Sequence, residues 1–351
     1  MTTRVLHLVG SAVSPLLADL SRLYAEDCLA SAVDPAMHED VLAHVSPGGR
    51  WRFPTDLSDD GLAAAEPLSL DAAVRHLAEL RPDVAVPQMF CLPGMTTYRG
   101  LLDLLQIPYP GNTPEVMALA AHKQRAKSVV AGAGVPTPRG VLLSPGEAPP
   151  DRWPTVVKPV DADNSSGVSL VRAPGDYAAA LEAAFAESSQ VLVEDYVELG
   201  REVRCGVLEV EGELRCLPLE EYAVDAGTKP IRGYDDKLRR GADDGALSLV
   251  AKDAAHAWIV DPEDPITPRV WEVAKVCHRA LGCRDYSLFD FRIDPEGRPW
   301  FLEAGLYCSF AEKSVVAVMA KAAGIDLRDL FSGAVDQALS RRTQPVGGLS
   351  R

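Results

Sequence analysis

The stretch from Asp290 to Gly305 constrains this chain most, because it places two acidic residues in two apolar strands joined by a turn. We predict strands at 289–293 and 299–302, with turn-compatible Pro and Gly between them. Asp290 and Glu303 would then meet across the hairpin. Burying two carboxylates as charges is costly, and a divalent cation such as Mg²⁺ would remove much of that cost. The alternative is a pair of acidic strand ends that face water.

Length, charge and cysteine content bound the class of protein. A chain of 351 residues suggests two or three lobes, and its net charge of −15 argues against a non-specific nucleic-acid or anionic-membrane surface. No apolar run reaches the roughly 18–20 residues that span a bilayer, and the N-terminus lacks a signal-peptide cleavage pattern. Seven scattered cysteines without a Cys-x-x-Cys pair predict reduced thiols. We therefore expect a cytoplasmic protein with no nucleic-acid or membrane partner.

The first 113 residues alternate predicted strands and helices, which favours an open parallel sheet. A strand ends near Gly10, and Ser14 with Pro15 starts a helix. An apolar loop at 88–96 follows a second buried strand, at the strand end where α/β proteins bind ligands. For each of these two segments the sequence leaves two alternatives open: a plain connection or a substrate contact.

Two stretches carry lysines in different settings. We predict one helix over 114–132, with Lys123 and Lys127 on one face; taken alone, this pattern favours a solvated basic face. Lys158 instead lies inside an apolar strand, where an ammonium group needs a partner. A Ser/Gly loop at 163–169 follows it, and such loops let backbone N–H groups approach an anion. Lys158 and this loop therefore indicate a phosphate cradle, although not of the Walker type.

The remaining elements complete a recognisable order. A buried strand at 190–197 ends in acidic residues, a hairpin with its turn at 211–212 follows, and 220–240 is a long polar loop. We predict a helix over 267–281 before the acidic hairpin, and a tail from residue 341 onward.

The order and spacing of these motifs from Lys123 to Ser314 resemble the ATP-grasp superfamily, and within it the D-alanine–D-alanine ligase-like carboxylate–amine ligases. The resemblance implies an α/β protein with the ATP-grasp fold, in which an N-terminal open parallel α/β lobe precedes two α+β lobes that clasp ATP. The implied domains are 1–113 (substrate lobe), 114–215 (central lobe), 216–340 (C-terminal lobe) and 341–351 (tail).

The resemblance also implies roles for individual residues. The expected ATP-binding residues are Lys123, Lys158, Ser165, Ser166, Gly167, Glu194, Tyr196, Val197, Glu202 and Lys237. Among them, Glu194 is expected near the adenine amino group and Glu202 on the ribose. Lys237, Ser165 and Ser166 are expected to be catalytic, around the transferred phosphate. The expected substrate-binding residues are Ser314, Tyr307 and Arg204, and the expected magnesium ligands are Asp290 and Glu303.

The reaction implied is ATP-dependent, ADP-forming ligation of an acid to an amine through an acyl phosphate, with ATP and Mg²⁺ as cofactors. Two alternatives stay open: an ATP-binding protein without ligase activity, and a phosphotransferase that uses the same cradle. A homodimer is expected by analogy alone.

Several positions depart from the family's pattern. Leu288 stands where the family has an oxyanion-binding arginine, and Gly305 where it has an asparagine metal ligand. The acidic residues and histidine expected near Gly10, Met89 and Gly94 are missing too. The candidate replacements for the arginine are Arg204, Arg232, Arg239 and Arg240, and the sequence does not choose among them. We therefore expect altered amino-acid subsites and a role in specialised metabolism.

Overall fold

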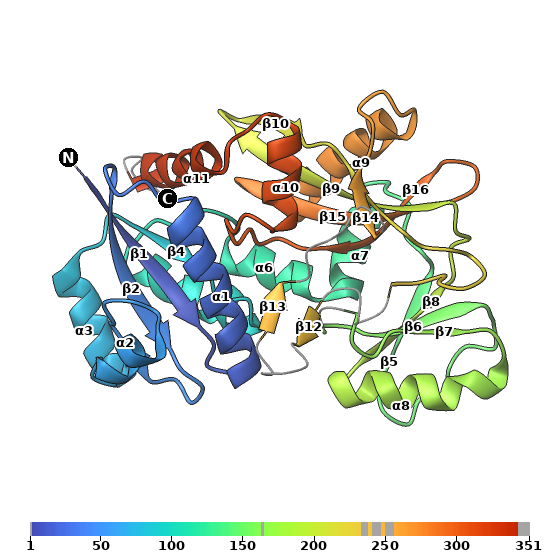
Figure 1. Cartoon of the computed structure of the whole chain (residues 1–351). Coiled ribbons are helices and arrows are strands. Elements are labelled where there is room, and N and C mark those ends of the chain that lie inside the picture. The colour runs from blue at the N-terminus through green and yellow to red at the C-terminus, as the bar shows by residue number, and fades with distance from the viewer. Residues whose placement is uncertain (1, 163–164, 233–237, 241–246, 250–255, 343–351) are drawn as a thin grey trace, which may run out of the picture. The chain divides into compact units, whose positions relative to one another are not determined.

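A computed structural model describes residues 2–162, 165–232, 238–240, 247–249 and 256–342 (Figure 1). The chain forms two compact units. Unit 1 consists of Met1–Ala118, Arg284–Tyr286 and Tyr307–Arg351, and unit 2 consists of Leu119–Cys283 and Ser287–Leu306. None of the helices in the described part of the chain has the length and apolar character needed to cross a bilayer.

Unit 1 is built on a four-stranded sheet in the order β3-β2-β1-β4. Strand β1 pairs in parallel with both β2 and β4, whereas β3 is antiparallel to β2, so the expected parallel α/β lobe is confirmed. The strands are β1 (Thr3–Gly10), β2 (His38–Val45), β3 (Trp51–Arg52) and β4 (Val84–Pro87). The described helices of this unit are α1 (Pro15–Ser31), α2 (Asp59–Ala64), α3 (Leu70–Leu80), α4 (Leu92–Met95), α5 (Thr97–Leu104), α10 (Val315–Ala322) and α11 (Leu327–Arg342).

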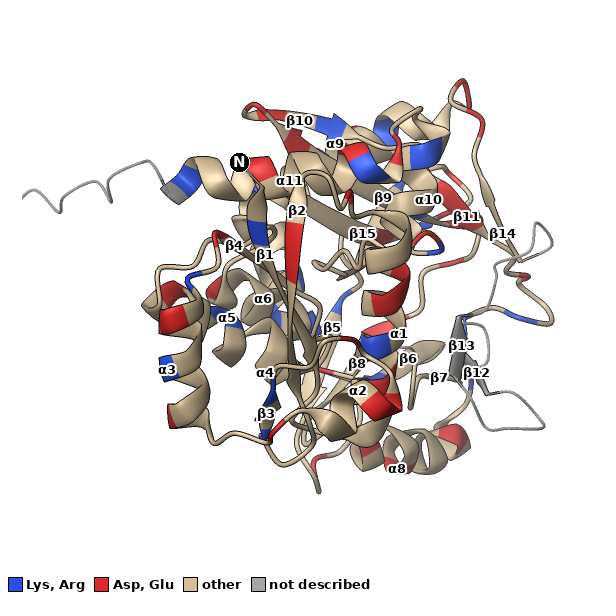
Figure 2. Ribbon diagram, turned by 60° about the vertical axis from the view of Figure 1, so that its left-hand side comes forward, with Lys and Arg blue, Asp and Glu red and all other residues tan. Residues whose placement is uncertain are grey.

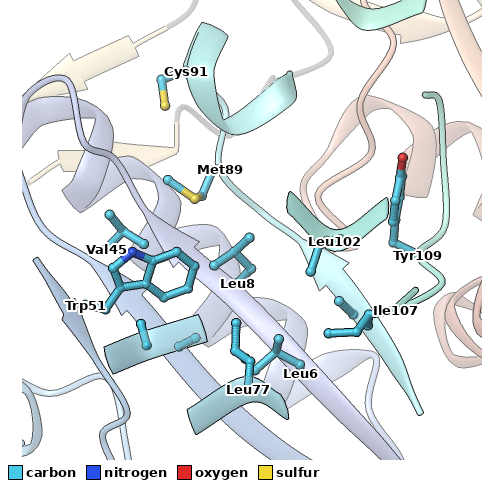
Figure 3. Packing of buried hydrophobic residues seen from close by; sticks show 13 residues of the cluster. Leu6, Leu8, Val45, Trp51, Leu77, Met89, Cys91, Leu102, Ile107 and Tyr109 are labelled. Carbon is cyan, nitrogen blue, oxygen red and sulfur yellow. The ribbon is translucent and has the colours of Figure 1, made fainter. Parts of the chain in front are cut away.

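The core of unit 1 forms where alternate residues of β1 meet the helices and loops beside the sheet. Leu6 and Leu8 point to the same side of β1, as a two-residue period requires, and Trp51 and Leu77 lie beside them (Figure 3). The loop after β4 contributes Met89, which is 2% exposed. This apolar loop is therefore packed into the core of its own unit.

The C-terminal helix α11 was not predicted, and the expectation of a tail beginning at residue 341 is wrong for Arg341 itself. This residue lies in α11, and its guanidinium group donates to both Asp285 carboxylate oxygens, at 2.7 and 2.9 Å. It also donates to the Tyr109 carbonyl. Residues 343–351 lie outside the described part, and the domain boundaries stay a prediction.

The predicted single helix over 114–132 is two helices, α6 (Pro114–Ala121) and α7 (Lys123–Gly132). His122 interrupts them with an extended backbone (φ −99°, ψ 98°), and its side chain caps α7 by accepting from the Arg125 N–H. The break makes Lys123 the first residue of α7, and its N–H donates to the Val160 carbonyl at 2.9 Å.

Unit 2 contains two larger sheets. The first has the order β5-β8-β6-β7, with antiparallel pairing throughout, and α8 packs beside it (Figure 1). The second is six-stranded, with the order β14-β11-β9-β15-β16 and β10 paired to β9. The strands of the first sheet are β5 (Gly140–Leu143), β6 (Thr155–Pro159), β7 (Ser169–Val171) and β8 (Val191–Asp195). Those of the second are β9 (Arg201–Val210), β10 (Glu213–Cys216), β11 (Glu220–Tyr222), β14 (Ala257–Ile259), β15 (Tyr286–Ile293) and β16 (Pro299–Ala304).

Besides α7, the other described elements of unit 2 are two helices, a 3₁₀ turn and a small strand pair. They are η1 (Pro174–Asp176), α8 (Tyr177–Glu187), α9 (Ile266–Leu281), β12 (Leu238–Arg240) and β13 (Leu247–Leu249). Every residue of β15 is buried, and the rings of Phe289, Phe291 and Phe301 pack together with centroids 6.1–6.4 Å apart. This apolar packing fixes the strand that carries Asp290.

The charge of the chain follows from many acidic side chains at the surface. Acidic residues lie on α2, α3 and α8, among other elements (Figure 2). Most of the basic residues of the candidate functional site, in contrast, are buried.

Candidate functional site

One pocket within unit 2 collects most of the residues that the sequence singled out. It encloses about 720 Å³, part of it open to solvent. The predicted site residues among its lining are Lys123, Lys158, Ser165, Glu194, Tyr196, Val197, Glu202, Asp290 and Glu303. They come from both large sheets of this unit, from the start of α7 and from the loop after β6.

A buried lysine cluster, made of Lys127, Lys158 and Glu194, forms one side of the site. The Glu194 carboxylate forms ion pairs with Lys127 Nζ at 2.8 Å and Lys158 Nζ at 2.5 Å. All three residues are less than 8% exposed. The lysine expected to need a partner in its apolar strand therefore has one, from the neighbouring strand β8.

Electrostatics within this lysine cluster favour a net positive charge. Burial would raise the pKa of Glu194, but the adjacent Lys127 and Lys158 ammonium groups outweigh burial and lower it. Burial lowers the pKa of Lys127 to about 8, with Glu194 opposing the shift. The solvated basic face favoured for Lys123 and Lys127 is wrong, since these side chains are buried. The adenine role of Glu194 stays a prediction, because its oxygens contact lysines.

Lys123 links the start of α7 to the acidic hairpin. Its ammonium group donates to the Ala162 carbonyl and lies 3.8 Å from a Glu303 carboxylate oxygen. The side chain is only 8% exposed. The helix break at His122 brings this lysine to the pocket.

The acidic hairpin forms as predicted. Strands β15 and β16 are antiparallel, and Asp290 and Glu303 are direct cross-strand partners. The ladder shifts register between Asp290 and Phe291, where Leu302 is an additional residue on β16. Asp290 is 3% exposed, whereas the Glu303 side chain is 34% exposed.

The two hairpin acids suit one divalent cation. Within the described ranges, no three His, Cys, Asp or Glu side chains gather into a group that would hold a metal by itself. Mg²⁺ commonly takes one or two carboxylates and completes its shell with phosphate oxygens and water. Asp290 and Glu303 are therefore sufficient for one such ion only where a phosphate chain is also bound.

An arginine cluster, made of Arg204, Arg232, Arg292, Glu202 and Asp290, forms the other side of the site. Arg204 donates to both Asp290 oxygens, and Arg232 Nη2 donates to Asp290 Oδ2 at 2.7 Å. Arg232 Nε donates to Glu202 Oε1 at 2.5 Å, and Arg292 Nη2 donates to Glu202 Oε2 at 2.6 Å. Burial would raise the pKa of Glu202, but Arg232 and Arg292 outweigh it and lower that pKa.

The small-residue loop is held by backbone conformation. Ser165 and Gly167 have φ values of +59° and +68°. A Cβ at Gly167 would lie 2.9 Å from Pro159 Cγ and 3.0 Å from the Ala183 carbonyl oxygen, so this position needs glycine. Ser165 lines the pocket, and Ser166 adjoins it in the loop. Lys237 lies outside the described residues, and its catalytic role stays a prediction.

Two predicted substrate residues, Tyr307 and Ser314, belong to unit 1. Ser314 is the N-cap of α10 and accepts a hydrogen bond from the Ala317 N–H. The Tyr307 ring packs against Phe90, with centroids 5.1 Å apart. Their substrate contacts stay predictions.

Sequence reasoning missed Lys127 and Arg292 as site residues. Lys127 was seen at helical spacing from Lys123, but its burial depends on a carboxylate 67 positions later in the chain. Arg292 lies two residues after Asp290 on the same strand, and this spacing puts both side chains on one face. The two-residue spacing from Asp290 was therefore the sequence signal that could have identified Arg292 as a site residue.

Comparisons with known proteins identify a family model, relatives in sequence and solved structures with a similar fold. Residues 150–336 match the family model described as the D-ala D-ala ligase C-terminus. A D-alanine–D-alanine ligase of Methylobacterium radiotolerans is 34% identical over 281 residues, which cover 76% of this chain and 84% of that protein. A similar ligase of Brucella anthropi is 33% identical over 274 residues, covering 75% of this chain and 82% of that protein.

Solved structures show the same fold. The D-alanine–D-alanine ligase from Bacillus anthracis superposes with a TM-score of 0.74 at 21% identity and covers 97% of this chain and 99% of its own. The VanG D-Ala:D-Ser ligase from Enterococcus faecalis gives a TM-score of 0.75 at 20% identity, with coverages of 96% and 99%. The predicted ATP-grasp architecture is thereby confirmed.

Proposed function

Since this chain belongs to the D-alanine–D-alanine ligase family of ATP-grasp enzymes, which form C–N bonds, we propose that it joins an amino-acid-like acid other than D-alanine to an amine. The family supports ATP-dependent carboxylate–amine ligation. The identity of the acid, the use of Mg²⁺ and the residue roles are parts of the proposal.

One observation carries the proposal: a single pocket contains buried lysines opposite a paired-carboxylate hairpin. Lys123 and Lys158 supply positive charge, and Asp290 and Glu303 supply oxygen ligands. This combination suits the phosphate chain of a nucleotide, which carries several negative charges and shares a divalent ion with carboxylates.

The chemistry proceeds in two balanced steps. A substrate carboxylate oxygen attacks the γ-phosphorus, the bond from that phosphorus to the bridging oxygen breaks, and ADP leaves with the electron pair. The amine nitrogen then attacks the acyl carbon and loses a proton, and inorganic phosphate leaves with the oxygen that came from the acid. Each step moves negative charge among the phosphate and acyl oxygens, so fixed cations lower its barrier.

The residues of the pocket divide this work. Lys123 and Lys158 would neutralise phosphate charge, and the Ser165–Gly167 loop would cover the phosphates and exclude water from the acyl phosphate. Bound Mg²⁺, held by Asp290 and Glu303, would supply Lewis-acid stabilisation of phosphoryl oxygens. Tyr196 and Val197 would offer backbone groups to the adenine edge, and Glu202 would face the ribose.

Features of unit 1 support a changed acid substrate. At Gly94 a Cβ would lie 2.3 Å from the Met89 Cβ, so no acidic side chain fits that position without movement of the loop. Met89 is buried and apolar, and the family resemblance places a histidine near this position. Without these polar side chains the amino-acid subsite differs from that of the family, so an acid other than D-alanine suits it, and a role in specialised metabolism would follow. Cytoplasmic location and a homodimer stay predictions.

The test is release of ADP and phosphate from ATP and Mg²⁺ against pooled D- and L-amino acids, with products identified by mass spectrometry. We expect ADP together with a condensed mass equal to acid plus amine minus water. ADP with a stable phosphoester would instead establish a phosphotransferase. ATP binding without ADP under every pool would contradict ligation of amino-acid-like substrates.

A further inference from the structure

Arg232 connects two carboxylates that the proposed function assigns to different parts of ATP. Its Nε donates to Glu202, the proposed ribose acid, and its Nη2 donates to Asp290, the proposed metal ligand. Arg232 also lines the pocket, and its side chain is 9% exposed. A nucleotide that runs from Glu202 to Asp290 must therefore pass this guanidinium group.

The guanidinium group is held in a fixed plane. Its carbon lies 3.9 Å from the centroid of the Tyr222 ring, a stacking distance for arginine on an aromatic face. Of its five N–H donors, the bonds above use two. No acceptor for Nη1 occurs among the residues that the structure describes. Arg232 is thus oriented by three partners and retains donors for a ligand.

Arg204 stabilises this arrangement from β9. It donates to both oxygens of Asp290 and lies 5.4 Å from the same Tyr222 ring. Leu288, two residues before Asp290 on β15, is apolar and buried. The guanidinium groups that donate to Asp290 therefore come from β9 and from the segment after β11, and Leu288 contributes none.

The arginine cluster offers more hydrogen-bond donors than its carboxylates take up. Arg232 uses two of its five N–H donors on Glu202 and Asp290. The charge of the cluster is balanced, because Glu220 is a buried cross-strand partner of Arg204. The remaining donors of Arg232 therefore suit a phosphate oxygen of the nucleotide, which accepts charge-assisted hydrogen bonds.

We propose that Arg232 binds phosphate oxygens of the nucleotide between the ribose and the transferred phosphoryl group, and that Arg204 is a positioning residue that acts through Asp290. This assignment rests on the proposed function, because it takes ATP as the ligand of the pocket. The replacement for the family's oxyanion-binding arginine, for which four arginines are candidates, is a separate role and stays a prediction.

Calorimetric titration of the full chain with ATP·Mg²⁺, ADP and adenosine tests the assignment. Arg232→Met should weaken ATP and ADP binding by roughly 10- to 100-fold, because charge-assisted hydrogen bonds are lost, and adenosine binding by less than about 3-fold. Arg232→Lys keeps the charge without the planar fork, and should fall between Met and wild type. Arg204→Lys should lower turnover more than it weakens ADP binding, as expected of a residue that positions Asp290.

Arg298→Met is the matched control, because Arg298 is 63% exposed and pairs with Asp294 outside the pocket lining. It should bind all three ligands like wild type. If Arg232→Met does not fold, a folded Arg232→Lys variant tests the assignment instead. Unchanged ATP affinity in that variant, or equal losses of affinity for ATP and adenosine, would overturn the assignment. If wild type itself binds no ATP, the proposed function fails first, and that result is distinguishable from failure of the variants alone.

Discussion

The lysine cluster and the arginine cluster both pair buried carboxylates with cationic side chains, but the cations differ. Each buries carboxylate groups of the pocket against positive side chains, and the lysine cluster retains one positive charge in excess. Ammonium groups are compact and can lose a proton when buried, whereas guanidinium groups stay charged and bind in a planar fork. Binding on the lysine side of the site is therefore sensitive to pH, whereas binding on the arginine side depends on the geometry of the guanidinium groups.

The largest effects should come from removing one central charge on each side. Lys158→Ala and Asp290→Asn should each lower turnover at least ~100-fold, because the phosphate charge or its cation loses a direct partner. Steady-state ADP release measures this. Lys275→Ala, which only removes a pairing with Glu272 on α9, is the control and should keep wild-type turnover. Full activity in either pocket variant would contradict the role of that residue's charge in turnover.

The pH dependence should separate the two clusters. The pKa of Lys127 is about 8, so its ammonium group loses a proton as pH rises through that value. The lysine cluster then loses its excess positive charge, and ATP binding should weaken by up to about tenfold. The arginine cluster stays charged over this range.

Lys127 variants sharpen that prediction. Lys127→Arg keeps its charge and should remove the loss of affinity near pH 8, whereas Lys127→Met should bind ATP weakly at every pH. Adenosine affinity, which depends little on this charge, is the control in the same titrations. An identical pH profile in wild type and Lys127→Met would remove Lys127 from the phosphate side of the site.

The two clusters also differ in how far the sequence predicted them. Lys158 was identified because an ammonium group in an apolar strand needs a partner, and the Asp290–Glu303 pairing followed from turn residues and strand period. Those signals are local. The pairing of Glu194 with both lysines could not be predicted from local signals, because β8 is far from α7 in sequence and meets it only in the folded unit.

Loop and helix boundaries marked the other limit of prediction. Arg232 lies between β11 and β12, where no strand or helix period predicts the direction of its side chain, so its contacts with Glu202 and Asp290 could not be predicted from the sequence. The break at His122 depends on the bond from the Lys123 N–H to the Val160 carbonyl, a tertiary contact. Tertiary contacts of this kind override a continuous helical pattern.

Transfer of an oxygen atom from the acid to phosphate tests the central claim most directly. The acid substrate found in the ligation screen would be labelled with ¹⁸O in its carboxylate, and the phosphate and nucleotide would be examined by mass spectrometry after turnover. An acyl phosphate places one ¹⁸O in inorganic phosphate for each amide formed and none in the nucleotide. Unlabelled phosphate, or label in AMP, would contradict ligation through an acyl phosphate in this pocket.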